Sequence, residues 1–270
     1  MKRILNYPGS KWNMASWIID HMPKHDVYLE LFFGSGAVFF NKERAKIETI
    51  NDIDSRIVNL FQVIRDNPEA LSNAIEYTLL SREEHQLSFA DEGDSVERAR
   101  RFLVRCWQSI GAKTSDKTGW RSSINPSGSK NKEWSSLTDR IWPITNRLRN
   151  TQIENQPACE LIQRYNRENV LIYVDPPYPL ESRSKRHYAF EMSLEDHYDL
   201  LNVLCKHEGP VILSSYDNEL YNEQLTNWRK ETLVVTAERG VKKLETLYIN
   251  PTAATYTNQI NLFEKELEIY

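Results

Sequence analysis

The sequence is constrained most by the residues Asp175-Pro176-Pro177-Tyr178, which follow the short apolar run 171–174. A run of branched and aromatic residues that is stopped by two prolines is typical of a buried strand. Asp175 then lies at the carboxyl edge of that strand, where open α/β sheets bind ligands. Because proline lacks an N–H and disfavours helix in the preceding residue, the backbone stays extended and its carbonyl oxygens stay free. A fixed carboxylate, free carbonyl oxygens and an aromatic ring suit a planar ligand that carries an amino group.

A second group of motifs lies near the N-terminus. Residues 27–40 read as a strand, a glycine turn at Gly34 and Gly36, and the start of a helix. Glycine lets the backbone pass close to a ligand, and a helix start offers N–H donors. A short strand at 48–52 then ends in Asp52, where nucleotide-binding units bind ribose hydroxyls. The alternative is that Asp52 caps the next helix, although Asp54 is the better candidate for that cap.

Length and composition predict a soluble globular protein. The 270 residues suffice for one sizeable domain or one domain with an insertion, and the mean hydropathy is -0.60. No apolar run approaches the roughly 20 residues that span a bilayer, and the first residues lack the apolar stretch of a signal peptide. We therefore expect a cytoplasmic protein without membrane contact. Three scattered cysteines without CxxC spacing predict free, buried thiols rather than a disulfide or a zinc site.

The charge distribution is uneven. The chain carries a net charge of -4, which argues mildly against nucleic acid. Between Arg98 and Arg149, however, twelve basic residues stand against three acidic ones, a net charge of +9. Four of the seven tryptophans also lie in this stretch, and residues 111–136 have the composition of a mobile loop or hairpin. Cations with aromatic and small polar residues suit a surface that follows DNA phosphates, and the alternative is an ordinary solvated charged face.

Hydrophobic spacing predicts the remaining elements. Helices are expected at 12–22, with Ser10 or Asn13 as its cap, at 55–80 with a break at Pro68, and at 98–110, 141–148 and 159–165. An acidic surface loop is expected at 83–95. A further helix should begin at Ser193, and strands are expected at 152–155 and 211–215, with an antiparallel pair at 233–235 and 246–249.

Taken together, these motifs resemble the Dam-like DNA adenine-N6 methyltransferases, in particular the α-group members of phage and prophage type. The matches are Tyr7 to Lys11, Phe32 to Gly36, Asp52 to Asp54, Asp175 to Tyr178, Ser214 to Asn218 and Tyr248 to Pro251. The resemblance implies an α/β fold with a Rossmann-like methyltransferase sheet, mainly parallel with a terminal antiparallel hairpin. It further implies a catalytic domain made of 1–65 and 149–270 and a mostly helical target-recognition insertion at 66–148.

The resemblance also implies roles for individual residues. Asp175, Pro176, Pro177 and Tyr178 would form the catalytic site. The cofactor S-adenosyl-L-methionine would be bound by Tyr7, Lys11, Phe32, Phe33, Gly34, Ser35, Gly36, Asp52, Ile53 and Asp175, with Lys11 near its carboxylate. From the basic segments we expect DNA contacts at Lys113, Lys117, Trp120, Arg121, Lys130, Arg183, Lys185 and Arg186. No metal site is expected, and the recognised DNA sequence is not assumed to be GATC.

The functional hypothesis is transfer of a methyl group to N6 of a flipped-out adenine in double-stranded DNA. Asp175 and the Pro176 carbonyl would accept hydrogen bonds from the amine, and Tyr178 would stack on the base. The alternatives are methylation of cytosine N4, methylation of a protein or RNA amine, and a non-catalytic DNA-binding module with a relic cofactor pocket. A cognate restriction nuclease and the oligomeric state are left open by the sequence.

Overall fold

The fold is built on a seven-stranded sheet with the strand order β3-β2-β1-β4-β5-β7-β6. We describe a computed structural model that places residues 1–112, 116–122, 130–180, 188–236 and 242–255. The strands are β1 (Val27–Glu30), β2 (Ile47–Asn51), β3 (Thr151–Glu154), β4 (Val170–Val174), β5 (Val211–Tyr216), β6 (Arg229–Thr236) and β7 (Lys242–Ile249). The first five pair in parallel, and β7 runs antiparallel to β5 and β6. The predicted Rossmann-like sheet with a terminal antiparallel hairpin is therefore confirmed.

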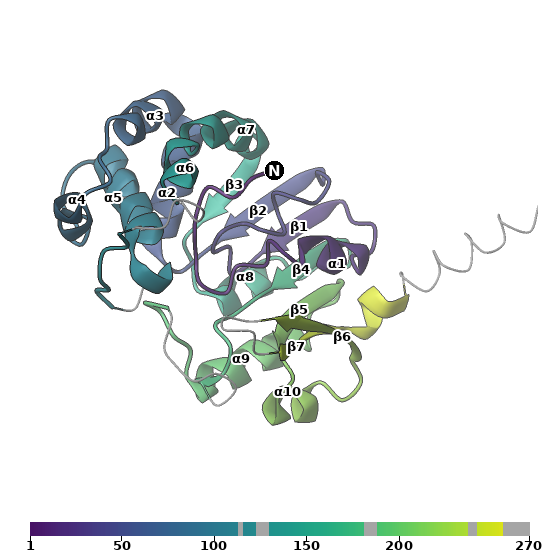
Figure 1. Ribbon diagram of the computed structural model, residues 1–270. Helices are drawn as coiled ribbons and strands as arrows, with labels where there is room; N and C mark the ends of the chain where they lie inside the picture. The colour runs from purple at the N-terminus through teal and green to yellow at the C-terminus, as the bar shows by residue number, and fades with distance from the viewer. Residues whose placement is uncertain (113–115, 123–129, 181–187, 237–241, 256–270) are drawn as a thin grey trace, which may run out of the picture.

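Neighbouring residues in the central strands alternate between two hydrophobic cores, because side chains in a strand point to opposite faces. Tyr173 and Ile212 belong to the core shared with α1 (Ala15–Asp20) and α2 (Ser55–Asp66). Ile172 and Leu213 belong to the other core. The helices that contribute to this second core are α8 (Ala158–Arg164), α9 (Leu194–Leu204) and α10 (Glu219–Gln224). Helices thus cover both faces of the sheet (Figure 1), which leaves its edges for ligands.

The helices between α2 and β3 form a layer beside the sheet, seen at the upper left of Figure 1. They are α3 (Pro68–Glu76), α4 (Arg82–Leu87), α5 (Ser95–Gln108), the short 3-10 helix η1 (Ile110–Ala112), α6 (Lys130–Ser135) and α7 (Thr138–Leu148). Phe102, Trp107 and Ile141 in this layer belong to the same hydrophobic core as α2. The insertion is therefore packed against the sheet through a shared core.

A buried ion cluster ties the last insertion helix to the sheet. The guanidinium of Arg147 in α7 binds both carboxylate oxygens of Glu48 in β2 and donates a hydrogen bond to the Phe39 carbonyl at 3.1 Å. Lys42 binds the same carboxylate at 2.8 Å. All three charged side chains are almost fully buried. Removing one partner of such a cluster leaves an uncompensated buried charge, so it fixes α7 on β2.

Three local predictions were wrong. The segment 83–95 was expected to be a loop, but it contains α4, whose Ser81 cap accepts a hydrogen bond from Glu84 N at 3.0 Å. Ser81 and Glu84 have the spacing of a capping box, so the signal for a helix start was present in the sequence.

The second error concerns the helix start expected after Gly36. Residues 34–41 form successive turns and no regular helix. All of Ala37 to Phe40 are buried, whereas a surface helix would expose one side.

The third error concerns the first helix, which begins at Ala15 with Met14 at its N-cap and no side-chain cap. Ser10 and Asn13 therefore do not cap it. Other predictions are confirmed: Asp54 caps α2 through Arg56 N, and Ser193 caps α9 in a capping box with Asp196. The three cysteines are free, but among them only Cys106 is buried. No helix within the described ranges is long and apolar enough to cross a membrane.

Candidate active site

Asp175 follows the most buried strand of the sheet. All five residues of β4 are buried, and β4 lies between β1 and β5 as the central strand of the seven-stranded sheet. The two prolines after Asp175 end the strand, since neither can donate to a sheet ladder. The carboxylate is thereby held at the carboxyl edge of the sheet. The parallel strands β1 and β2 also end at this edge, and the loops that follow them begin there.

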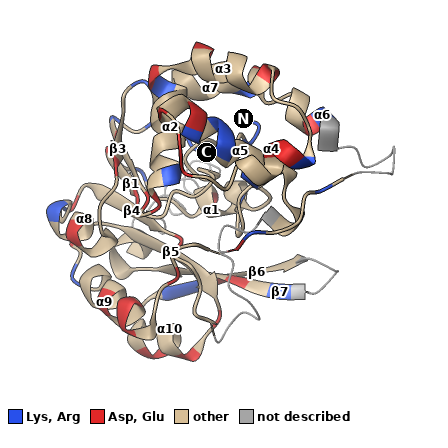
Figure 2. Ribbon diagram, turned by 90° about the vertical axis from the view of Figure 1, so that its left-hand side faces the viewer, with Lys and Arg blue, Asp and Glu red and all other residues tan. Residues whose placement is uncertain are grey.

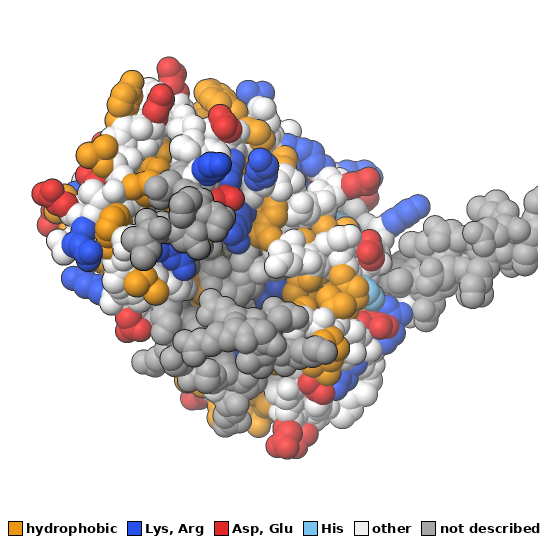
Figure 3. Space-filling model, viewed as in Figure 1, with side chains coloured by type: hydrophobic (Ala, Val, Ile, Leu, Met, Phe, Trp, Pro, Cys, Tyr) orange, Lys and Arg blue, Asp and Glu red, His pale blue; other side chains and the backbone are white. Residues whose placement is uncertain are grey.

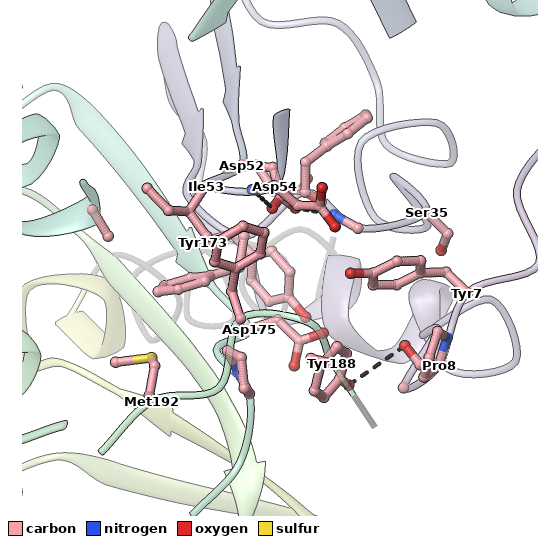
Figure 4. Close-up of a pocket in the computed structure, with 18 of the residues that line it drawn as sticks. Tyr7, Pro8, Ser35, Asp52, Ile53, Asp54, Tyr173, Asp175, Tyr188 and Met192 are labelled. Carbon is pink, nitrogen blue, oxygen red and sulfur yellow. Dashed lines mark hydrogen bonds between the residues drawn. The ribbon is translucent and has the colours of Figure 1, made fainter. Parts of the chain in front are cut away.

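These loops enclose a cavity of about 350 Å³ at the carboxyl edge. Its walls come from the N-terminal loop, the turns after β1, the loop after β2, the start of α8, the corner after β4 and the first half of α9. The lining residues are Tyr7 to Lys11, Glu30, Phe32 to Ser35, Ala37, Val38, Asp52 to Asp54, Pro157 to Cys159, Tyr173, Asp175, Pro177, Tyr188, Phe190 to Met192, Asp196, Asp199 and Leu200. Figure 4 shows the rings of Tyr7 and Tyr173 between Asp52 on one side and Asp175 on the other.

Most of the residues expected at the cofactor site line this cavity. They are Tyr7, Lys11, Phe32, Phe33, Gly34, Ser35, Asp52, Ile53 and Asp175. Gly36 does not line it. A Cβ on Gly36, at a φ of 66°, would lie 2.5 Å from the rings of Phe33 and Phe40, so this glycine is required for packing beneath the turn.

Asp52 holds the turn after β1 against the loop after β2. Its Oδ2 accepts a hydrogen bond from Gly34 N at 2.9 Å, and its Oδ1 accepts one from Asp54 N at 2.9 Å. Burial raises the pKa of Asp52 to about 7 although these two N–H groups favour the carboxylate. Each oxygen keeps a lone pair, so the carboxylate can accept further hydrogen bonds from a ligand.

The carboxylate of Asp175 is paired with Lys11 across the cavity wall. Lys11 Nζ lies 3.1 Å from Asp175 Oδ1, and the Asp175 side chain is only 18% exposed. Burial raises the pKa of Asp175 to about 6, while the Lys11 ammonium opposes this rise. Oδ1 is buried, and the Lys11 ammonium lies against it.

Tyr178 lies behind Asp175 and does not line the cavity, nor does Pro176. The Tyr178 hydroxyl donates a hydrogen bond to Glu245 Oε2 in β7 at 2.8 Å, and its ring packs edge-on against Tyr216 with centroids 4.7 Å apart. Lys11 Nζ lies over the same ring, 4.6 Å from its centroid. The ring is 7% exposed, and the Lys11 ammonium covers part of it.

Sequence reasoning missed two acidic residues that shape the site, Glu30 and Glu245. Glu30 at the end of β1 lines the cavity and accepts a hydrogen bond from the Tyr28 hydroxyl at 2.6 Å, and burial raises its pKa to about 8. Glu245 in β7 accepts the hydrogen bond that the Tyr178 hydroxyl donates. Tyr188 closes the cavity by donating a hydrogen bond to the Pro8 carbonyl at 3.4 Å (Figure 4). A Cβ on Gly9 would lie 2.0 Å from the Tyr188 hydroxyl, so only glycine fits beneath this contact.

The expected DNA-contact residues are placed only in part. Trp120 and Arg121 lie in a hairpin stem formed by Ile110 N with the Gly119 carbonyl and Arg121 N with the Gln108 carbonyl. Lys117 is exposed beside this stem. Lys113, Arg183, Lys185 and Arg186 lie outside the described residues, and Lys130 begins α6 but its side chain is likewise not described.

Comparison with known proteins identifies the family. Residues 7–240 match the D12 class N6 adenine-specific DNA methyltransferases. The chain belongs to this family. Its activity is therefore methylation of adenine in DNA, so the expected Dam-like resemblance is confirmed and the cytosine alternative is not supported.

Individual relatives agree with this assignment. The chain is 26% identical over 267 residues to the type II methyltransferase M1.LlaDCHI of Lactococcus lactis subsp. cremoris, covering 90% of each chain. It is 23% identical to the DNA adenine methylase of Serratia marcescens, covering 90% of this chain and 93% of the relative. It is also 23% identical to the DNA adenine methylase of Escherichia coli K12, covering 82% and 83% respectively. The alignments span nearly the full length of these DNA methyltransferases.

Proposed function

We propose that the chain binds S-adenosyl-L-methionine in the cavity and transfers its methyl group to N6 of a flipped adenine held at Asp175. The observation that carries this proposal is the position of Asp175 on the wall of a cavity that also contains Asp52 and the turn at Gly34. Methyl donor and target amine would then meet at one carboxylate. A role in restriction and modification is an expectation from the type II relative.

The charge of the cavity supports a cationic cofactor. Among the described lining residues, seven are acidic (Glu30, Asp52, Asp54, Asp175, Glu191, Asp196 and Asp199), and Lys11 is the one Lys or Arg. Glu30 adds no charge at neutral pH, because burial raises its pKa to about 8. A cleft lined by one sign of charge raises the local concentration of the opposite charge. Asp52 would accept hydrogen bonds from ribose hydroxyls, and the exposed Ile53 would pack on the adenine ring of the cofactor.

At the target amine, the chain's own groups would act by position and charge. Bound S-adenosyl-L-methionine supplies the electrophilic methyl group and a thioether leaving group. Asp175 Oδ1 and the Pro176 carbonyl would accept the two amine N–H bonds and make the nitrogen lone pair available. Once methylated, the target nitrogen would carry a positive charge and would have to lose a proton. Asp175 can accept that proton or pass it to solvent.

The target base would have to leave the duplex to reach this corner, since its amine is not accessible in stacked DNA. Tyr178 lies next to Asp175 and is the aromatic side chain expected to stack on the base. Its ring is now covered by Lys11, so stacking requires this lysine to move. Tyr188 and Tyr173, which line the cavity, offer further aromatic walls.

We assign the DNA-binding surface to the insertion. A small cavity of about 270 Å³ lies between α4 and the hairpin stem, lined by Arg82, His85, Gln86, Phe89, Lys117, Thr118, Gly119 and Trp120. None of these described residues is acidic. The Arg82 guanidinium lies 5.2 Å from the Trp120 ring centroid, and Lys117 Nζ lies 5.7 Å from that of Phe89. Cations held next to aromatic rings can bind phosphate and stack on a base.

The wider charge distribution agrees with this assignment. Figure 2 shows acidic residues along α9 and α10, whereas α5 in the insertion carries four arginines, Arg98, Arg100, Arg101 and Arg105. Figure 3, viewed as in Figure 1, shows Lys and Arg side chains on the upper half of the molecule together with Asp and Glu side chains. Over 66–148 as a whole, however, twelve basic and twelve acidic residues balance. DNA would therefore be attracted locally, to the cations beside the hairpin stem, and repelled by the acidic side chains along α9 and α10.

The proposal is tested by incubating the protein with plasmid DNA and methyl-labelled S-adenosyl-L-methionine. We expect label in N6-methyladenine for the wild type and none for Asp175→Ala, while calorimetry shows similar binding of S-adenosylhomocysteine to both. Asp26→Ala is the matched control, since Asp26 is exposed and lies before β1. Sequencing the methylated plasmid maps the recognition site. Wild-type methylation by Asp175→Ala would remove this residue from the mechanism.

A further inference from the structure

Lys11 occupies the position that a target amine would need. Its Nζ lies 3.1 Å from Asp175 Oδ1 and donates a hydrogen bond to the Gly9 carbonyl at 3.1 Å. It also lies over the Tyr178 ring, 4.6 Å from the centroid. An adenine presented for methylation needs the same carboxylate oxygen for its amine and the same aromatic residue for its ring. The ammonium and the base therefore compete for one place.

The ammonium is held there by more than one charge. Burial alone would lower the pKa of Lys11, but the carboxylates of Asp175 and Glu245 outweigh it and raise the pKa. The side chain is 6% exposed. If Lys11 left without a replacement, these two buried carboxylates would lose their cation, which is unfavourable. A neutral adenine amine cannot supply the missing charge, so it cannot displace Lys11 without cost.

We propose that Lys11 fills the acceptor-amine position of the free protein, and that adenine enters only after the ammonium has moved to another anion. This inference rests on the proposed function. Lys11 also lines the cavity assigned to the cofactor, so an amino-acid carboxylate bound in that cavity would be the anion that receives it. The flexible four-carbon stem of lysine permits such an exchange. Lys11 is then a positioning residue that makes base binding depend on prior cofactor binding.

The proposal makes an atom-specific prediction about affinity. We would prepare two duplexes that carry the mapped recognition sequence, one with adenine at the target and one with purine, which lacks the 6-amino group. The ratio of their dissociation constants reports the amine contact with Asp175. Comparing this ratio between proteins, with and without S-adenosylhomocysteine, cancels the different energies of unpairing the two bases.

In the wild type we expect little discrimination without S-adenosylhomocysteine, and a preference for adenine that grows about tenfold when it is bound. By reciprocity, the adenine duplex should tighten S-adenosylhomocysteine binding by the same factor, whereas the purine duplex should not. In Lys11→Met, which has a similar length and no charge, the preference for adenine should already be present without S-adenosylhomocysteine. Lys11→Arg keeps the charge and should retain the wild-type dependence.

Two results would overturn the inference. If Lys11→Met without S-adenosylhomocysteine discriminates as little as the wild type does, the ammonium is not what excludes the amine. If none of the proteins prefers adenine under any condition while the plasmid is still methylated, the amine does not bind at Asp175. The catalytic role proposed for Asp175 is then wrong as well. Circular dichroism verifies that each variant is folded, and Lys11→Gln, which is also uncharged, replaces Lys11→Met if that variant does not fold.

Discussion

The hydroxyl of Tyr178 donates a hydrogen bond to Glu245, 2.8 Å away in the antiparallel strand β7. This contact joins the loop after β4 to a strand 67 residues later in the chain. Glu245 is 7% exposed, so the bond is made away from water. The antiparallel strand β7 therefore fixes the orientation of the ring that follows Asp175 and the two prolines.

The hydroxyl and the ring of Tyr178 should have separable effects. Tyr178→Phe keeps the ring but leaves the buried Glu245 without its donor, so we expect a loss of about 1–3 kcal/mol in the free energy of unfolding and a modest loss in kcat. Tyr178→Ala removes the stacking surface and should reduce kcat/KM roughly 10- to 100-fold. Urea denaturation and steady-state methylation measure the two effects. Equal losses of activity in both variants would contradict stacking.

The dependence of methylation on pH should report Asp175. Burial raises its pKa to about 6 and Lys11 opposes this rise, so the ionised form is lost as the pH falls through about 6. We expect kcat/KM for DNA to decrease below that pH, because this parameter follows the ionisation of the free protein. Lys11→Met removes the opposing charge and should move the acidic limb to higher pH. Lys46→Met, at an exposed lysine, should leave the limb unchanged.

Glu30 should make stability depend on pH. Burial raises its pKa from 4.5 to about 8, so the folded state binds a proton that the unfolded state has already released at intermediate pH. Its contribution to the free energy of unfolding is therefore present below about pH 4.5 and lost as the pH rises towards 8. Glu30→Gln should flatten this decline in urea titrations between about pH 5 and 8. An unchanged decline, with Glu231→Gln as the exposed control, would exclude Glu30 as its source.

Phosphate contacts by the insertion should appear in the salt dependence of DNA binding. Arg82→Ala and Lys117→Ala should each weaken binding and reduce the slope of log K against log salt by about 0.9, the amount expected for one phosphate. The weakening should be similar for all DNA sequences. Lys206→Ala, at an exposed lysine after α9, should change neither quantity. Slopes equal to that of the wild type would move the DNA-binding surface elsewhere.

The sheet and the cavity at its carboxyl edge could be predicted because the residues that form both are local in the sequence. Asp175, Asp52 and Gly34 each follow a short strand, and the carboxyl ends of parallel strands meet at one edge. Their convergence therefore follows from connectivity alone. The helix expected after Gly36 did not form, because packing around Phe33 and Phe40 overrode the local pattern.

The polar contacts of Asp175 and Tyr178 were not predicted. They depend on the direction of side chains that come from segments far apart in the sequence. Lys11 was expected near a ligand, and no periodicity indicates that it contacts Asp175. Glu245 did carry a signal: it stands two and four residues before Leu247 and Ile249, which are buried, so an acid shares their inward-facing row. An acid in a buried row requires a partner, and here the partner is Tyr178.

The bond between Arg147 and Glu48 limits how specificity could be exchanged between relatives. A chimaera that replaced 66–148 as one block would lose Arg147. The buried carboxylate of Glu48 would then keep Lys42 but lose its bonds to the guanidinium. A graft that ends between α6 and α7 keeps the contact between Arg147 and Glu48 and exchanges the segments that we propose as the DNA-binding surface. To engineer a new target site in this enzyme, exchanged and retained residues should therefore be joined between α6 and α7, so that α7 stays with the sheet.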